Sequence, residues 1–160
     1  DKKNTEYLNV MNTGDCRAVI SRNNIAYALT NDHKPNKPEE KIRIQNLGGT
    51  IRFDGYDWRI NDLSVSRAFG DNESKEYVSH IPDLYKYKIG NSDKFIIMGC
   101  DGLWDVMDNQ FAVDFVTEKC YNIDTNERIN KKYNIAKQLA EHAISIGSTD
   151  NVSILVIFLK

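Results

Sequence analysis

Alternation of apolar and polar positions is the most frequent pattern along this chain. Leu8 and Val10 fall on one side of an extended segment at residues 6–12, and residues 84–89 alternate in the same way, which predicts half-buried strands. Short turn-forming stretches separate the first strands, as in an antiparallel meander. We expect strands at residues 6–12, 17–21, 25–29, 50–53, 58–60, 84–89, 95–98 and 152–159. The last is apolar almost throughout, which predicts burial on both faces.

Three other segments are predicted to be helical. Pro38 suits the first turn of a helix over residues 38–47, where its missing N–H costs nothing. Asp108 can cap a helix that carries apolar residues on one face over residues 109–116. Residues 135–144 repeat apolar positions at four-residue intervals and predict a second amphipathic helix. Mostly antiparallel strands with helices laid against them place the chain in the α+β class.

The apolar run at residues 95–98 predicts a buried strand that opens into an acidic turn. Asp101 and Asp105 follow the strand four residues apart, and Asp101 is followed by Gly102, which permits backbone conformations that other residues resist. Carboxylate oxygens in such a place are the ligands that Mg²⁺ and Mn²⁺ prefer. The alternative interpretation is an ordinary Asp-Gly turn with solvated carboxylates, because turn chemistry alone explains the pair.

Aspartates recur in turns beside other predicted strands, at Gly14-Asp15, Gly70-Asp71 and Asp150-Asn151. Carboxylates at strand ends can converge on one rim of a sheet, where they repel one another unless cations neutralise them. The pattern therefore permits a divalent metal site. Solvated turn aspartates remain the alternative.

Composition narrows the function classes. The chain has 160 residues, 28% of them charged and 41% hydrophobic, with a formal net charge of −2. This composition indicates one globular domain or part of one. The charges form no basic patch of the kind that binds nucleic acid. No apolar run is long enough to span a membrane. The three cysteines match neither a disulfide framework nor a zinc pattern. We therefore expect free thiols in a reducing compartment, cytoplasmic or nuclear.

Five sequence motifs, in order, resemble the metal-dependent serine/threonine protein phosphatases of the type 2C family. The motifs are YLNVMNTGDCRAV at 7–19, ALTNDHKPNKPEEKIRIQNLGGTI at 28–51, RINDLSVSRAFGD at 59–71, FIIMGCDGLWDVMDNQFAVDFV at 95–116 and GSTDNVSILVI at 147–157. They cover nearly the whole chain in the order and spacing of the family.

The resemblance implies an antiparallel β-sandwich flanked by helices, in which water bound to two Mg²⁺ or Mn²⁺ ions attacks the phosphoserine or phosphothreonine of a protein substrate. By position, Asp101 and Asp150 resemble metal-ligand aspartates of the family. Asp15 and Asp105 resemble carboxylates at an additional, weaker metal site in some members. No catalytic or substrate-binding residue is assigned.

The sequence also departs from the family. An Asp-Gly-His segment and an Arg-x-x-x-Glu-Asp arrangement, which belong to the amino-terminal half of the family's domain, do not occur here. We therefore expect residues 1–160 to form the carboxy-terminal portion of a single type 2C phosphatase-like domain, with the amino-terminal part missing. The isolated chain is then expected to be inactive unless a partner supplies the missing half. The alternative is a catalytically dead phosphatase-like module that binds proteins.

Overall fold

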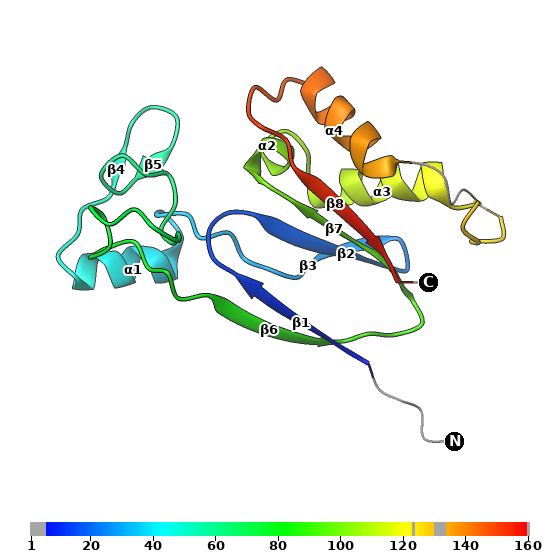
Figure 1. The fold of residues 1–160 in the computed structure, drawn as a ribbon, viewed down its shortest axis with the longest axis horizontal. Helices are drawn as coiled ribbons and strands as arrows, with labels where there is room; N and C mark the ends of the chain where they lie inside the picture. The colour runs from blue at the N-terminus through cyan, green and yellow to red at the C-terminus, as the bar shows by residue number, and fades with distance from the viewer. Residues whose placement is uncertain (1–5, 123, 130–133, 160) are drawn as a thin grey trace. The chain divides into compact units, whose positions relative to one another are not determined.

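A computed structural model of the chain describes residues 6–122, 124–129 and 134–159, and its elements are labelled in Figure 1. In chain order the elements are β1 (Tyr7–Asn12), β2 (Arg17–Arg22), β3 (Ile25–Ala28), α1 (Pro38–Asn46), β4 (Arg52–Phe53), β5 (Trp58–Arg59), β6 (Asp83–Lys88), β7 (Asp93–Gly99), α2 (Asp101–Trp104), α3 (Asn109–Cys120), α4 (Ile135–Ser145) and β8 (Ile154–Phe158). The predicted strands and helices are thus present, with small shifts at their ends. Antiparallel sheets with helices confirm the α+β class.

The chain folds into two compact units. The first contains residues 1–9, 17–30 and 86–160, and the second contains residues 10–16 and 31–85. Strands β1 and β6 pair with each other, and the division between the units crosses both strands. The expectation of a single domain stays a prediction.

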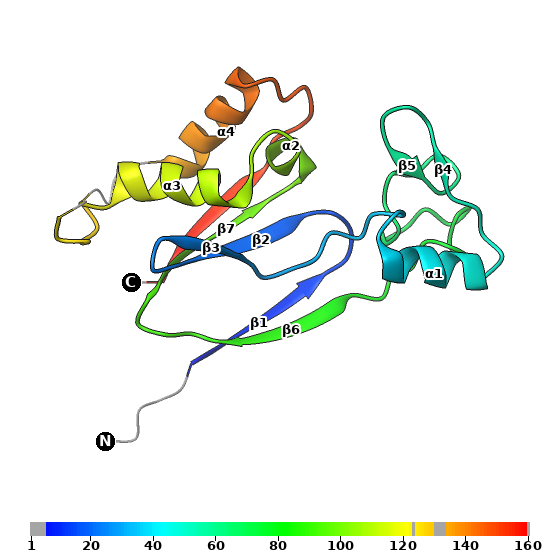
Figure 2. The ribbon, with the colours of Figure 1, turned by 180° about the vertical axis from the view of Figure 1, so that it is seen from behind.

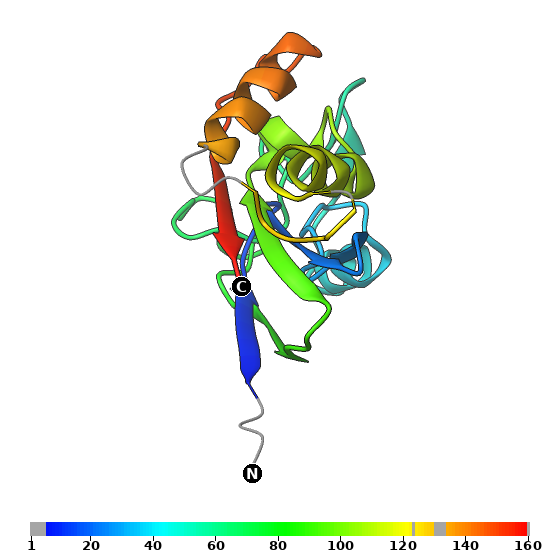
Figure 3. The same cartoon turned by 90° about the vertical axis from the view of Figure 1, so that its right-hand side faces the viewer.

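The first unit is built on a four-stranded antiparallel sheet in the order β3-β2-β7-β8. Strand β7 lies between β2 and β8, so Ile97 is paired with Val19 on one side and with Val156 on the other. Helices α3 and α4 lie together against one face of this sheet, as Figures 1 and 3 show. Phe95 and Ile97 of β7 are completely buried between the sheet and these helices.

The second unit has a smaller core beneath α1. Ile44 of α1 packs with Ile60 and Val78, and the first two are completely buried. Pro38 occupies the first turn of α1, as predicted. Strands β4 and β5 form the short antiparallel hairpin of this unit, which stands clear of α1 in the view of Figure 2.

Two local predictions were wrong. Burial alternates along β8, with Leu155 and Ile157 exposed, because the helices that the structure describes cover only one face of its sheet. The segment after β7, predicted to be only a turn, forms the short helix α2. Among the described residues, none of the helices has the length and apolar character needed to cross a lipid bilayer.

Candidate metal-binding loops

Asp101 follows strand β7 and lies at the surface of the first unit. Cys100 has an extended backbone and precedes α2, so Asp101 is the first residue of that helix. One carboxylate oxygen of Asp101, Oδ1, accepts a hydrogen bond from the backbone N–H of Gly102 at 2.9 Å. The side chain is half-buried. Asp101 therefore lies in the first turn of α2, called the Asp101 turn below, and not in a freely solvated loop.

Asp150 lies in the segment that joins α4 to β8. Its Oδ1 accepts a hydrogen bond from the backbone N–H of Asn151 at 2.6 Å, the same local arrangement as that of Asp101. The residue is exposed. Both predicted ligands are thus held by the backbone N–H of the next residue.

The structure brings the Asp101 turn and the Asp150 segment together. Ser148 donates its hydroxyl hydrogen to the carbonyl oxygen of Gly102 at 2.6 Å. The backbone N–H of Cys100 donates to the carbonyl oxygen of Ser153 at 3.2 Å. A β-carbon added at Gly102 would lie 2.4 Å from the carbonyl oxygen of Asn151. These distances show that the segments carrying the two aspartates are in direct contact.

Asp105 follows α2 and is exposed. Its backbone N–H donates to the carbonyl oxygen of Asp101 at 2.9 Å, so the two aspartates are one helical turn apart. Asp105 also lines an open cavity of about 640 Å³, together with Arg17 and Trp104. Its predicted role as a weak metal ligand stays a prediction.

Asp15 belongs to the second unit, where a lysine neutralises it. The Nζ atom of Lys34 lies 2.5 Å from Oδ2 of Asp15, and both side chains are largely buried. The turn before Asp15 is held by His33, whose Nδ1 accepts the N–H of Gly14 at 3.1 Å. Gly14 has φ +106°, a conformation that favours glycine. A metal ion would have to compete with the Lys34 ammonium for the Asp15 carboxylate.

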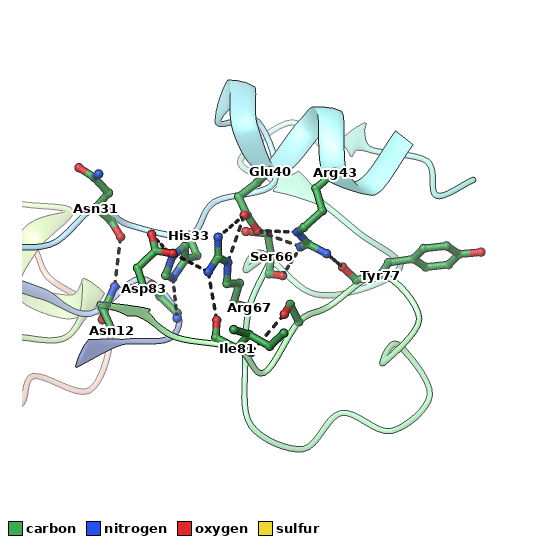
Figure 4. Close-up of polar contacts among 12 residues, drawn as sticks. Asn12, Asn31, His33, Glu40, Arg43, Ser66, Arg67, Tyr77, Ile81 and Asp83 are labelled. Carbon is green, nitrogen blue, oxygen red and sulfur yellow. Dashed lines mark hydrogen bonds and ion pairs between the residues drawn. The ribbon is translucent and has the colours of Figure 1, made fainter. Parts of the chain in front are cut away.

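A buried ionic network, which sequence reasoning missed, holds the surroundings of this turn in the second unit (Figure 4). Glu40 is 2% exposed, and Arg67 and Arg43 donate to its two oxygens at 2.7 and 2.8 Å. Arg67 also donates to Asp83 at 2.8 Å, and Asp83 contacts Nε2 of His33 at 3.2 Å. The charges therefore connect α1, through Asp83 and His33, to the Gly14 turn.

Burial and hydrogen bonding act in opposite directions on the acidic members of this network. Burial alone would raise the pKa of Glu40, but hydrogen bonds from Arg67 and Arg43 outweigh it and lower that pKa to about 2. Burial also raises the pKa of Asp83, and hydrogen bonds from His33 and Arg67 more than offset this effect, so the net shift is downward. Both carboxylates are thus ionised at neutral pH.

The described side chains supply some of the donor atoms that a metal centre needs. Carboxylate oxygens suit Mg²⁺ and Mn²⁺, and Asp101 and Asp150 supply them from adjoining segments. However, within residues 6–122, 124–129 and 134–159 no three His, Cys, Asp or Glu side chains gather in a way that could hold a metal ion. The described residues therefore fit part of a metal site and do not complete one.

Comparison with known proteins assigns the family. The model of the protein phosphatase 2C family matches residues 2–152. A PP2C-like domain-containing protein of Acanthamoeba polyphaga mimivirus is 45% identical, over 97% of this chain and 96% of its own length. A probable protein phosphatase 2C of Arabidopsis thaliana is 42% identical over 94% of this chain, which spans only 40% of that protein.

Solved structures agree with the sequence relatives. A serine-threonine phosphatase 2C from Toxoplasma gondii has a TM-score of 0.79 and 27% sequence identity. The match covers 96% of this chain and 55% of the Toxoplasma chain. A sex determining protein of C. elegans has a TM-score of 0.83 and 26% sequence identity. The match covers 96% of this chain and 36% of the C. elegans chain. With a family match over most of its length and relatives of this similarity, the chain belongs to the protein phosphatase 2C family.

Proposed function

We propose that this chain is a portion of a phosphoserine and phosphothreonine phosphatase and supplies Asp101 and Asp150 to its Mg²⁺ or Mn²⁺ site. Protein phosphatases 2C are metal-dependent and act on phosphoproteins. The observation that supports the proposal is the contact between the Asp101 turn and the Asp150 segment. Separate solvated turns would not need such contact.

The isolated chain is inactive under this proposal. Two carboxylates with waters can hold a hard cation only loosely, and the described residues add no third side chain to them. Hydrolysis then requires further ligands from a partner polypeptide or from chain outside these residues. We assign no hydrolytic step to the chain by itself.

Turnover measurements test this proposal. The chain is assayed with p-nitrophenyl phosphate and with a phosphothreonine peptide in excess Mn²⁺, alone and after addition of the amino-terminal portion of a relative. We expect no turnover alone and chelator-sensitive turnover after the addition. The Asp101→Asn variant, purified in the same way, controls for contaminating phosphatases. Chelator-sensitive turnover by the chain alone, absent from that control, would contradict the proposal.

A second candidate is a phosphatase-like module that binds proteins without catalysis. The observation that favours it is the mimivirus relative, since 96% of that protein corresponds to this chain. Reading the gene upstream of the Asp1 codon separates the candidates. An Asp-Gly-His segment encoded in frame favours the enzyme, and a natural start codon near Asp1 favours the binding module.

A further inference from the structure

A thiol adds two hydrogen bonds to the contact between the Asp101 turn and the Asp150 segment. The Sγ atom of Cys100 donates to the carbonyl oxygen of Asn151 at 3.0 Å. The same sulfur accepts a hydrogen bond from the backbone N–H of Ser153 at 3.2 Å. Cys100 directly precedes Asp101, and Asn151 directly follows Asp150. One side chain thus joins the two aspartate-bearing segments within one residue of each carboxylate.

Two further features keep these segments at a fixed spacing. The hydroxyl of Ser148 donates to the carbonyl oxygen of Gly102 from the other end of the Asp150 segment. Gly102 itself leaves no room, because a β-carbon there would overlap the Asn151 carbonyl oxygen. The contact is therefore made by hydrogen bonds at Cys100 and Ser148 and is limited sterically at Gly102.

We infer that Cys100, assisted by Ser148, is a positioning residue that holds Asp150 beside Asp101. The inference deepens the proposed function and rests on it for the meaning of the two carboxylates. Cys100 does not act on the substrate. Its thiol ties together the backbones of the segments that carry the two carboxylates, which repel each other when no cation lies between them.

The competing explanation is that Cys100 only fills space. Serine and alanine separate the two explanations, because they have similar volumes but only serine can both donate to Asn151 and accept from Ser153. A space-filling role predicts that Cys100→Ala and Cys100→Ser behave alike. A hydrogen-bonding role predicts that serine restores what alanine loses.

Amide hydrogen exchange of the 160-residue chain measures the contact without any metal. In Cys100→Ala we expect the Ser153 amide to exchange about three- to tenfold faster, as expected for the loss of one hydrogen bond, with Cys100→Ser close to the unchanged chain. Ser148→Ala should loosen the same segment, because it removes the hydrogen bond to Gly102. This variant replaces a Cys100 variant that fails to fold. Ser145→Ala, which loses an exposed hydroxyl bonded to His142 within α4, is the matched control and should change nothing there.

Mn²⁺ titration by calorimetry adds the link to the carboxylates. Cys100→Ala should bind Mn²⁺ about three- to tenfold more weakly than the unchanged chain, and Cys100→Ser should recover most of the difference. Equal exchange in all variants, or equal losses in the alanine and serine variants, would overturn the positioning role. If the unchanged chain binds no Mn²⁺, the metal part of the proposed function fails, and the exchange rates alone decide the role of Cys100.

Discussion

Glu40 is the residue whose charge contributes most clearly to stability. Its carboxylate is buried between Arg67 and Arg43, and its pKa falls from an ordinary value of 4.5 to about 2. A lowered pKa in the folded state means that the stabilisation is fully present above about pH 4.5 and is lost as the pH falls towards 2. A shift of this size corresponds to about 3 kcal/mol.

Substitution of Glu40 tests this reasoning. Glu40→Gln should lower the free energy of unfolding at pH 7 by about 3 kcal/mol, since it leaves Arg67 buried without its main counter-charge. It should also weaken the pH dependence between pH 4.5 and 2. Urea unfolding at pH 7 and at pH 3 measures both effects. Glu39→Gln, an exposed neighbour on the same helix, is the control, and equal losses in the two variants would refute the argument.

Asp101 is the residue on which the proposed metal site depends most. Asp101→Asn removes one of two carboxylates, and the amide oxygen can still accept the N–H of Gly102. Mn²⁺ binding should therefore weaken by at least about tenfold without loss of the fold. Substitution of residues that only support a metal's ligands already lowers metal affinity about 10- to 100-fold. Calorimetric titration measures the affinity.

The control for Asp101→Asn is Asp124→Asn, which removes the same charge from an exposed loop of the same unit. The opposing view is that Asp101 only shapes a turn, in which asparagine is equally suitable. Equal Mn²⁺ affinities for the unchanged chain and Asp101→Asn would support that view.

At the scale of elements, one side chain caps the start of α3. The carboxylate of Asp108 accepts the backbone N–H of Phe111 at 2.7 Å, as the sequence predicted for a helix cap. Asp108→Ala should lower the free energy of unfolding by about 1 kcal/mol, and Asp108→Asn much less. Urea unfolding measures the change. Asp114→Ala removes an equal charge further along α3 and should cost only about 0.3 kcal/mol; an equal cost in both variants would contradict the capping role.

Most elements could be predicted because their signals are local. Pro38 and the Asp108 cap fix helix starts, and alternation identifies β1 and β6. Helix α2 was missed because four residues are too few for a periodic pattern. The burial of β8 was overestimated because its apolar sequence is typical of a strand covered on both faces, whereas the described helices pack on only one face of its sheet.

At the scale of the whole molecule, ordered motifs over nearly the whole chain identified the family, but contacts between distant segments could not be predicted. Cys100 and Asn151 are 51 positions apart, and no local pattern indicates that a thiol joins them. The Glu40 network was missed for the same reason, since Arg67 and Asp83 come from other parts of the second unit. Aspartates in turns showed which residues could bind a cation, but not which of them the fold brings together.

One face of the β7–β8 pair leaves apolar side chains exposed. Met98 and Leu155 are direct partners across β7 and β8, and Ile157 lies on the same face of β8. Their exposures of 41%, 54% and 39% leave an apolar patch in water. In the described part of the chain, β8 is also the last strand of its sheet, and both an apolar patch and a sheet edge favour self-association.

We therefore expect the isolated chain to elute from a size-exclusion column as concentration-dependent oligomers. The double variant Met98→Lys with Leu155→Thr should elute as a monomer, because it places a charge and a hydroxyl in the patch while threonine keeps strand propensity. Ile25→Thr, an equally exposed apolar residue on β3 at the opposite edge of the sheet, is the control and should leave association unchanged. A monodisperse, unchanged chain that melts cooperatively at about 45–65 °C, as ordinary mesophile domains do, would show that the exposed face is tolerated.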